Sequence, residues 1–301
     1  MTNTTTRRCG FIAVLGAPNV GKSTLVNQMV GAKVSIVSPK VQTTRARVMG
    51  IAIRKDSQLV FIDTPGIFEP RRRLDRAMVA AAWSGVGDGD IRLLLVDAEK
   101  GVDSNTRKII ERLKEQNIRC HLVLNKVDMV NKPELLELAS KLNEKGIFDE
   151  IFMISALSGD GVDDLGNFLA EHAPNGPWHF PEDQMSDMTE RLLAAEITRE
   201  KLYLELRQEL PYAATVETET WAEKPDGSVK IEQVIFVERD SQKAIILGKG
   251  GAQIKKIGEL SRTELEEILG RRVHLFLFVK VREKWGDDPK RYRDWGLDFG
   301  A

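Results

Sequence analysis

One stretch of the chain has the residue types and spacing that bind the phosphates of a nucleotide. Residues 16–23 read G-A-P-N-V-G-K-S and fit the pattern G-x-x-x-x-G-K-[ST]. Glycines in such a loop let successive backbone N–H groups point inward at a phosphate, and the start of a following helix adds partial positive charge. Lys22 supplies a mobile charge for the outer phosphates, and the Ser23 hydroxyl is a suitable Mg²⁺ ligand. The pattern predicts a nucleoside triphosphate site made by Gly16, Ala17, Pro18, Asn19, Val20, Gly21, Lys22, Ser23 and Thr24.

A second motif, D-T-P-G, occupies residues 63–66 directly after the apolar run 58–62. An aspartate at the carboxyl end of a buried strand can hold Mg²⁺ through a water, and a glycine N–H just beyond it can sense a terminal phosphate. Pro-Gly alone is typical of a simple turn. Its place at a strand end, 47 residues after Gly16, favours a magnesium and phosphate switch. The residues assigned to it are Asp63, Thr64, Pro65, Gly66 and Ile67.

The tetrapeptide N-K-V-D at 125–128 bears on the identity of the base. A carboxylate at Asp128 can accept hydrogen bonds from both N1–H and the exocyclic amine of guanine, which adenine cannot donate together. A single N-K-x-D also occurs as a solvated loop at a strand end. Ser155-Ala156 follows a further apolar run, and its backbone can close over the base. The motifs together predict guanine binding by Asn125, Lys126, Val127, Asp128, Ser155 and Ala156.

The elements that must position these motifs are short apolar runs followed by helical patterns. Apolar runs at 11–15, 48–53, 58–62, 91–96, 121–124 and 151–154 predict strands. Helical spacing follows the first motif up to Gly31 and recurs at 106–113 and 163–169. The basic segment 33–47 lacks periodicity and is predicted to be a loop. This alternation is typical of an α/β domain with the motifs at the carboxyl ends of its strands.

Composition excludes several classes of protein. The chain has 301 residues, a net charge of -1 and two cysteines, Cys9 and Cys120, too few for a disulfide framework or a zinc site. The four histidines are scattered without ligand spacing. The polar segment 1–10 does not resemble a secretory signal, and no apolar run approaches the roughly 20 residues that cross a bilayer. We expect a cytoplasmic protein without a transmembrane segment, and peripheral contact with the inner face of the cell membrane stays open.

A second domain is predicted after a proline-rich stretch at 173–185. Helical spacing covers 190–209, alternating patterns at 213–221 and 229–238 predict a hairpin, and an apolar run at 273–281 predicts a last strand. Between them lies G-K-G-G at 248–251, flanked by two helical patterns. Helices that meet at a Gly-x-x-Gly loop let a sugar–phosphate backbone approach closely, although a lone GxxG is a weak signal.

Charge near this loop supports a nucleic-acid contact. The segment 241–258 contains four lysines and no acidic residue, and such a patch is where phosphates bind. The predicted RNA-binding residues are Lys243, Gly248, Lys249, Gly250, Gly251, Lys255 and Lys256. Bases held over such a groove are mostly read in single strands. The aromatic residues Trp285, Tyr292, Trp295 and Phe299 either stack on bases or pack on the protein, and we favour packing.

The motifs in this order resemble those of Ras-like GTPases, and G-A-P-N-V-G-K-S with Q-T-T-R at 42–45 resembles the Era family. The carboxyl-terminal order helix, strand, strand, helix, helix, strand resembles the type II K-homology (KH) fold, which is the family's second domain. The resemblance implies a Ras-like P-loop GTPase domain with a mostly parallel six-stranded sheet, followed by a smaller α+β KH domain. The expected boundaries are 8–175 and 187–301, with a linker at 176–186.

The resemblance further implies hydrolysis of GTP to GDP and phosphate. Mg²⁺ is expected on Ser23, Thr44 and Asp63, with Thr43 as the alternative to Thr44. Catalytic roles fall to Lys22, Thr44, Gly66 and Asn19, and the asparagine raises the hypothesis of a bound K⁺ ion. Where Ras-like enzymes place a glutamine to orient water, this chain has Ile67. Intrinsic hydrolysis is therefore expected to be slow.

The family's partners are the 3′ region of small-subunit (16S) ribosomal RNA and the 30S subunit, whose maturation it assists. For this chain we expect a monomer in which the bound guanine nucleotide governs the grip of the second domain on RNA. Two other functions stay open. One is an RNA-binding adaptor with a passive nucleotide site, and the other is a GTPase in membrane or cell-cycle control.

Overall fold

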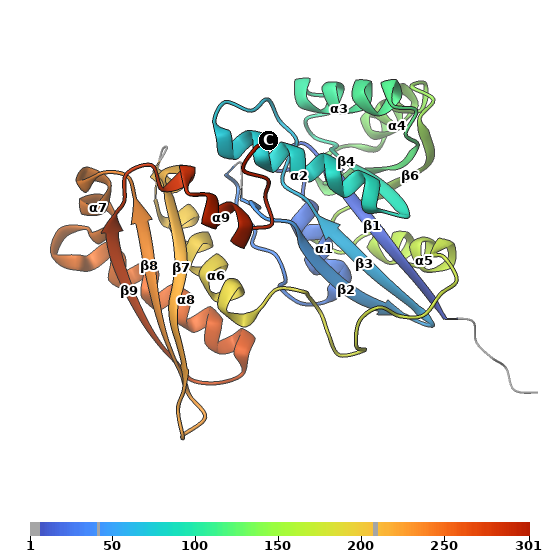
Figure 1. The fold of residues 1–301 in the computed structure, drawn as a ribbon. Helices are drawn as coiled ribbons and strands as arrows, with labels where there is room; N and C mark the ends of the chain where they lie inside the picture. Colours follow the sequence, from blue (N-terminus) through green and yellow to red (C-terminus); the bar gives the residue numbers. More distant parts are fainter. Residues whose placement is uncertain (1–6, 41–42, 207–209) are drawn as a thin grey trace, which may run out of the picture. The chain divides into compact units, whose positions relative to one another are not determined.

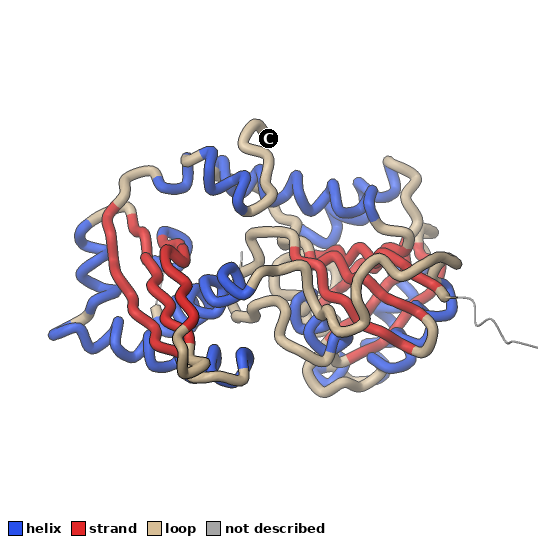
Figure 2. Tube along the Cα trace, turned by 60° about the horizontal axis from the view of Figure 1, so that its bottom comes forward, coloured by secondary structure: helices blue, strands red, loops and turns tan. Residues whose placement is uncertain are grey.

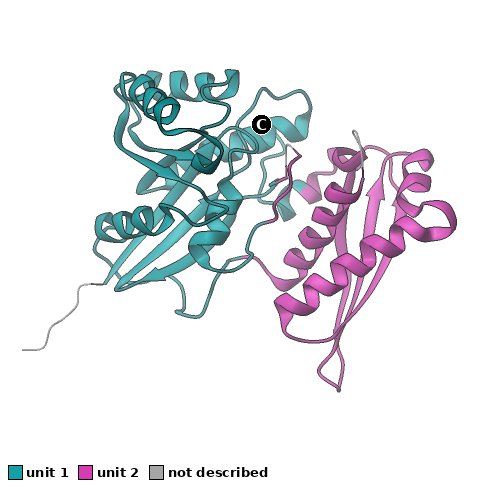
Figure 3. Ribbon diagram, turned by 180° about the vertical axis from the view of Figure 1, so that it is seen from behind, with its two compact units in different colours: residues 1–35, 44–187, 292–301 teal, residues 36–43, 188–291 magenta. Residues whose placement is uncertain are grey.

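The computed structural model describes residues 7–40, 43–206 and 210–301 (Figure 1). Gln42 of the Q-T-T-R motif and the last residues of the helix expected at 190–209 lie outside these ranges. The chain forms two compact units, shown in different colours in Figure 3. Unit 1 comprises Met1–Ser35, Thr44–Asp187 and Tyr292–Ala301, and unit 2 comprises Ile36–Thr43 and Met188–Arg291. Both units therefore contain a segment distant in sequence from their main part.

Unit 1 is built on a six-stranded sheet with the order β2-β3-β1-β4-β5-β6. Figure 2 shows the strands in red and the helices in blue. Only β2 runs antiparallel to its neighbour, β3, and the other pairs are parallel. The strands are β1 (Arg8–Gly16), β2 (Val48–Arg54), β3 (Ser57–Asp63), β4 (Ile91–Asp97), β5 (Cys120–Asn125) and β6 (Phe148–Ile154). The predicted Ras-like sheet is confirmed, because each apolar run is a strand buried between two helical layers.

Helices cover both faces of this sheet. α1 (Lys22–Val30) and α5 (Val162–His172) share one core with the sheet, and α2 (Arg73–Asp88), α3 (Ser104–Glu115) and α4 (Lys132–Asn143) cover the other face. The short 3₁₀ helix η1 (Val127–Met129) follows β5. α2 carries a weak sequence signal, because small residues such as Ala77, Ala82 and Gly85 make much of its buried face.

Unit 2 has a three-stranded sheet with the order β7-β8-β9. β7 (Ala214–Glu223) and β8 (Val229–Val237) are antiparallel, and β9 (Val273–Val281) lies parallel to β8. α6 (Glu190–Glu205) and α8 (Ala252–Leu269) pack on one face, and α7 (Asp240–Leu247) precedes the glycine loop η3 (Lys249–Gly251). The remaining elements are η2 (Leu210–Ala213), η4 (Trp285–Asp287) and α9 (Pro289–Asp294). The predicted KH order of elements is confirmed.

The aromatic residues of the carboxyl-terminal segment are packed, and they divide between the units. In unit 2, Trp285 is buried and its Nε1 donates to the carbonyl of Ala213 at 2.9 Å. In unit 1, the last ten residues lie against α2, where they form a cluster with Ala77 and Met78. Its aromatic members are Tyr292, Trp295 and Phe299. Packing with protein groups therefore accounts for all four aromatic side chains.

The two thiols provide a test of the core. Cys9 and Cys120 are free and only 6% and 2% exposed. Burial raises the pKa of both thiols, and that of Cys120 reaches about 12. Because the thiolate is the reactive species, neither cysteine should react with a disulfide reagent near neutral pH in the native protein, whereas denaturant should release two reactive thiols. Rapid labelling of the native protein in a stopped-flow assay would contradict the burial of the two thiols.

Candidate active site

The phosphate loop connects β1 to α1 and is shaped by two glycines with left-handed backbones. Gly16 has φ 149° and Gly21 has φ 98°. A Cβ atom on Gly21 would lie 2.1 Å from Nδ2 of Asn125, so no side chain fits at this position. Lys22 is buried, and its Nζ donates to the carbonyls of Gly16 at 3.1 Å and Ala17 at 2.9 Å. Burial lowers the pKa of Lys22 to about 8, and an anion in the loop would favour its charged form.

The three predicted magnesium ligands lie together at the start of α1. The Ser23 hydroxyl donates to Oδ2 of Asp63 at 2.7 Å and lies 3.0 Å from Oγ1 of Thr44. A fourth residue, Ser35, donates its hydroxyl to the same Asp63 oxygen at 2.6 Å. Asp63 is fully buried, and burial raises its pKa against the hydrogen bonds from Ser35 and Ser23, which lower it. Within the described ranges its Oδ1 is a buried oxygen with no hydrogen-bond partner.

The D-T-P-G motif runs beside the phosphate loop as predicted from its place after β3. The N–H of Ile67 donates to the carbonyl of Gly16 at 3.1 Å, and a Cβ on Gly66 would lie 2.8 Å from Cα of Pro18. The Thr64 hydroxyl donates to the carbonyl of Val14 at 2.8 Å. Thr64 and Pro65 are buried. The Ile67 side chain is only 6% exposed and belongs to the core that includes Ala82 and Val86. Its backbone alone therefore borders the loop.

Asn125 joins the base-binding segments to the phosphate loop. Its Nδ2 donates to the carbonyl of Val20 at 2.8 Å, and its Oδ1 accepts from the N–H of Ala156 at 2.9 Å. Lys126, with φ 67°, donates from Nζ to Oδ2 of Asp97 at 2.6 Å. Val127 and Asp128 lie in η1, where the aspartate is exposed, whereas Ser155 is buried. The arrangement leaves the Asp128 carboxylate accessible to a base.

Removal of the Asn125 bridge should affect stability as well as binding. Asn125→Ala leaves the buried carbonyl of Val20 and the N–H of Ala156 without their partner, and each unsatisfied buried group costs about 1–3 kcal/mol. We expect the free energy of unfolding of the nucleotide-free protein to fall by about 2–4 kcal/mol. Denaturant titration measures this change, with Asn131→Ala, which removes the cap of α4, as a control expected to cost about 1 kcal/mol. An equal loss for both variants would argue against the bridge.

The glycine loop of unit 2 has left-handed backbone conformations that glycine adopts without strain. Gly248, Gly250 and Gly251 have φ values of 71°, 61° and 79°. A Cβ on Gly248 would lie 2.7 Å from Cβ of Gln253, whereas Gly250 faces open space. The loop therefore presents bare backbone at the start of α8, next to Ile245 of α7, which is 58% exposed.

The four predicted lysines around this loop differ in their surroundings. Lys249 and Lys255 are exposed, and Lys243 is half-buried. Lys256 pairs with Glu205 of α6 at 2.6 Å. The acid-free sequence segment therefore has an acidic neighbour in space, so Lys256 offers less free charge to a phosphate than the other three.

Sequence reasoning missed several residues that shape these sites. Ser35 lies in a polar loop whose sequence has no signal for its bond to Asp63. Asn27 holds that loop, because its side chain bonds to the backbone of Val34 and Ser35. A signal did exist for Asp97, the partner of Lys126, since it follows an apolar strand as Asp63 does.

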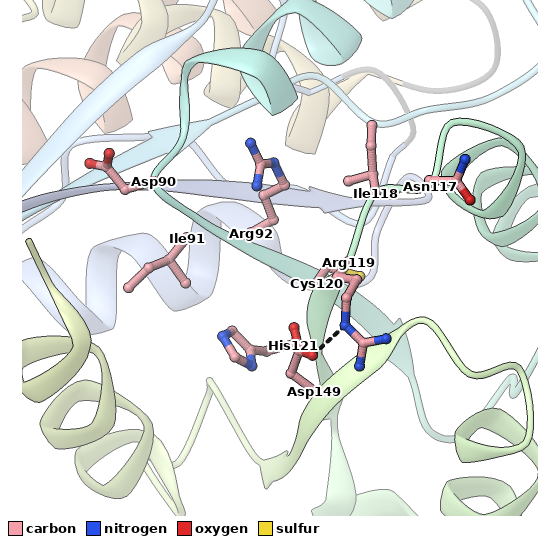
Figure 4. Close-up of a pocket in the computed structure, with 9 residues that line it drawn as sticks. All are labelled: Asp90, Ile91, Arg92, Asn117, Ile118, Arg119, Cys120, His121 and Asp149. Carbon is pink, nitrogen blue, oxygen red and sulfur yellow. Dashed lines mark hydrogen bonds and ion pairs between the residues drawn. The ribbon is translucent and has the colours of Figure 1, made fainter.

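A cavity of about 420 Å³ lies where strands β4 and β5 of unit 1 begin, and Figure 4 shows the residues that line it. Its lining residues include Ile91 and Cys120, the first residues of β4 and β5, whereas the nucleotide motifs follow the last residues of the strands. Two of its charges neutralise one another, because Arg119 Nε donates to Asp149 at 2.6 Å. The cavity is therefore separate from the nucleotide site.

Fold and site together define a class of protein, a P-loop GTPase fused to a KH module. Two family models match the chain, "50S ribosome-binding GTPase" at residues 11–126 and "KH domain" at residues 209–286. GTPase Era of Brucella suis is 61% identical over 298 residues, 99% of this chain and 96% of the relative. GTPase Era of a Bradyrhizobium species is 63% identical over 292 residues, 97% and 95% of the two chains. The chain belongs to the Era family of GTPases, and it hydrolyses GTP.

Two solved structures agree with this assignment. An Era variant from Aquifex aeolicus bound to GDP and AlF₄⁻ is 39% identical, with a TM-score of 0.90 over 96% of this chain and 99% of that one. Era in complex with MgGDPNP and nucleotides 1506–1542 of 16S ribosomal RNA is also 39% identical, with a TM-score of 0.91 and the same coverage. In the described ranges, no helix is both long and apolar enough to cross a membrane.

Proposed function

We propose that this chain is a GTP-hydrolysing switch that binds the 3′ region of 16S ribosomal RNA through unit 2 and assists maturation of the 30S subunit. The observation that carries the proposal is that one chain contains nucleotide motifs joined to one another by hydrogen bonds, Ser23 to Asp63 and Asn125 to Val20, and a Gly-x-x-Gly loop with positive-φ glycines. The similarity of this chain to an Era structure that contains MgGDPNP and nucleotides of 16S ribosomal RNA supports the same ligands here. We further propose cytoplasmic localisation, and domains at 8–175 and 187–301 joined by the linker 176–186.

The residues around Asp63 fit a magnesium ion. Hard cations bind hydroxyl and carboxylate oxygens, and Mg²⁺ keeps several waters. Ser23 and Thr44 would supply hydroxyl oxygens, and the unpartnered Oδ1 of Asp63 would accept from a metal-bound water. Bound there, Mg²⁺ would neutralise charge that develops on the β- and γ-phosphates. By family resemblance, Asn19 is proposed to hold a K⁺ ion beside the phosphates.

The chain's own residues then position the phosphates and stabilise the charge that develops on them. The bond between the γ-phosphorus and the β–γ bridging oxygen breaks as water attacks in line, and the products are GDP and phosphate. Lys22 and the loop N–H groups stabilise charge on the phosphates, and the N–H of Gly66 binds the terminal phosphate. The buried Ile67 side chain cannot orient water. The attacking water must therefore be placed by backbone, by a cation or by a partner.

The RNA assignment is tested by a negative charge at the glycine loop. Gly250→Asp should lower affinity for an RNA with the sequence of the 16S 3′ end by at least about tenfold, because the carboxylate repels the nearby phosphates. Gly227→Asp is the matched control, since Gly227 also has a left-handed backbone and open space in unit 2 but lies in the turn between β7 and β8. Fluorescence anisotropy measures both. Equal affinities for the two variants would refute the assignment.

A further inference from the structure

Two neighbouring strands of unit 1 end side by side at the N-K-V-D motif. Asp97 is the last residue of β4 and Asn125 is the last residue of β5, and the two are partners in the parallel register. The N–H of Ala98 donates to the carbonyl of Asn125 at 2.8 Å, which extends the pairing one residue beyond β4. Lys126 follows Asn125 directly, so its backbone starts at the end of β5.

The Asp97 carboxylate is buried and has a cationic partner. It is only 3% exposed, and its Oδ2 accepts a hydrogen bond from Nζ of Lys126 at 2.6 Å. A buried charge is costly unless it is paired and hydrogen-bonded. Nζ of Lys100 lies 3.9 Å from the same oxygen, but that side chain is 56% exposed, against 32% for Lys126. Lys126 is therefore the closer and the less solvated of these two lysines.

Backbone groups hold both partners of this ion pair. Oδ1 of Asp97 accepts from the N–H of Glu99 at 3.1 Å, and the N–H of Gly101 donates to the carbonyl of Asp97 at 2.9 Å. Lys126 has φ 67° and ψ 38°, a left-handed conformation that is uncommon for residues other than glycine. Both ends of the Lys126 side chain are therefore fixed, the Cα by the end of β5 and the Nζ by Asp97.

We infer that Asp97 is a positioning residue for the guanine base, and that it acts by fixing the Lys126 side chain across the ends of β4 and β5. A lysine side chain has four flexible carbons, and ordering them costs conformational entropy. With Nζ held by Asp97, that cost is met before the nucleotide binds, so the methylene groups offer a fixed apolar surface to a planar base. The inference rests on the proposed guanine site at N-K-V-D. Asp97 acts through Lys126 and not through a contact of its own with the nucleotide.

A double-mutant cycle on GDP affinity, measured by isothermal titration calorimetry, tests this role. Asp97→Ala should weaken GDP binding about tenfold, since it removes the charge-assisted hydrogen bond that holds Lys126. In a Lys126→Ala background the same change should have less than about a twofold effect, because the side chain that Asp97 positions is gone. The matched control is Asp103→Ala, since this carboxylate also accepts from a backbone N–H of unit 1, that of Thr106 at 2.7 Å, and caps α3. It should lower the stability and leave GDP affinity unchanged.

The outcomes separate this inference from the proposed function. An equal loss of affinity in both backgrounds overturns the inference, because a carboxylate that only supports the fold would act independently of Lys126. If Lys126→Ala alone leaves GDP affinity unchanged, the proposed place of Lys126 in the guanine site fails. If Lys126→Ala weakens binding and Asp97→Ala does not, only the positioning role fails.

A second variant covers the case in which Asp97→Ala does not fold. Asp97→Asn keeps an acceptor for the N–H of Glu99 and removes the negative charge beside Lys126. It should weaken GDP binding about threefold, since a neutral hydrogen bond is weaker than a charge-assisted one. Lys126→Ala should abolish that difference. Unchanged affinity in Asp97→Asn, or the same threefold loss without Lys126, overturns the inference.

Discussion

Asp128→Asn should convert the protein from a guanine-binding to a xanthine-binding one. The exposed Asp128 carboxylate has two acceptor oxygens for the N1–H and the amine of guanine. An asparagine amide offers one acceptor and one donor, which matches the N1–H and the C2 carbonyl of xanthine. Sites that depend on such pairing reject the wrong partner by about 10²–10⁵-fold. We expect GTP affinity to fall by about 10²–10⁴-fold and XTP to become the preferred nucleotide.

Competition titration with GTP, XTP and ATP measures this change. Asp164→Asn in the first turn of α5 is the matched control, since Asp164 is also exposed and unit 1 also contains it. It should retain GTP binding. If Asp128→Asn kept its preference for GTP, the base would be recognised elsewhere and the assignment of N-K-V-D would be wrong.

Lys22→Met should reduce affinity for both GDP and GTP by about 10²–10³-fold, since hydrogen bonds from a charged donor contribute about 1.5–3 kcal/mol each. In the structure the Lys22 ammonium bonds to two loop carbonyls, and burial lowers the pKa of Lys22 to about 8. Methionine retains much of the side-chain volume and removes the buried charge. The nucleotide-free protein should therefore lose little stability.

Isothermal titration calorimetry and thermal unfolding together check this prediction. Lys114→Met, at an exposed position near the end of α3, should bind nucleotide normally. A large drop in the midpoint of unfolding of nucleotide-free Lys22→Met would mean that the lysine serves the fold of the loop. Retained affinity would mean that the phosphates lie elsewhere.

The sequence by itself determined the fold class and the motif residues of the site. A strand–loop–helix unit is encoded within a few consecutive residues, so the conformation of Gly16–Ser23 and the ending of β3 at Asp63 can be predicted locally. Strand ends of a parallel sheet share one edge, which brings N-K-V-D beside the phosphate loop without further information. The KH order of elements was predictable for the same reason, since its apolar periodicities change at clear turns.

Only the tertiary structure decided which distant groups complete those motifs. No local pattern relates Ser35 to Asp63 or the carboxyl-terminal segment to α2. The same holds for the segment after Ser35, which the sequence predicts as a loop and which joins the KH core through Ile36 and Glu200. Such contacts depend on the packing of residues far apart in the chain. Burial and hydrogen bonding at those positions follow from the assembled core, so they became visible only in the folded protein.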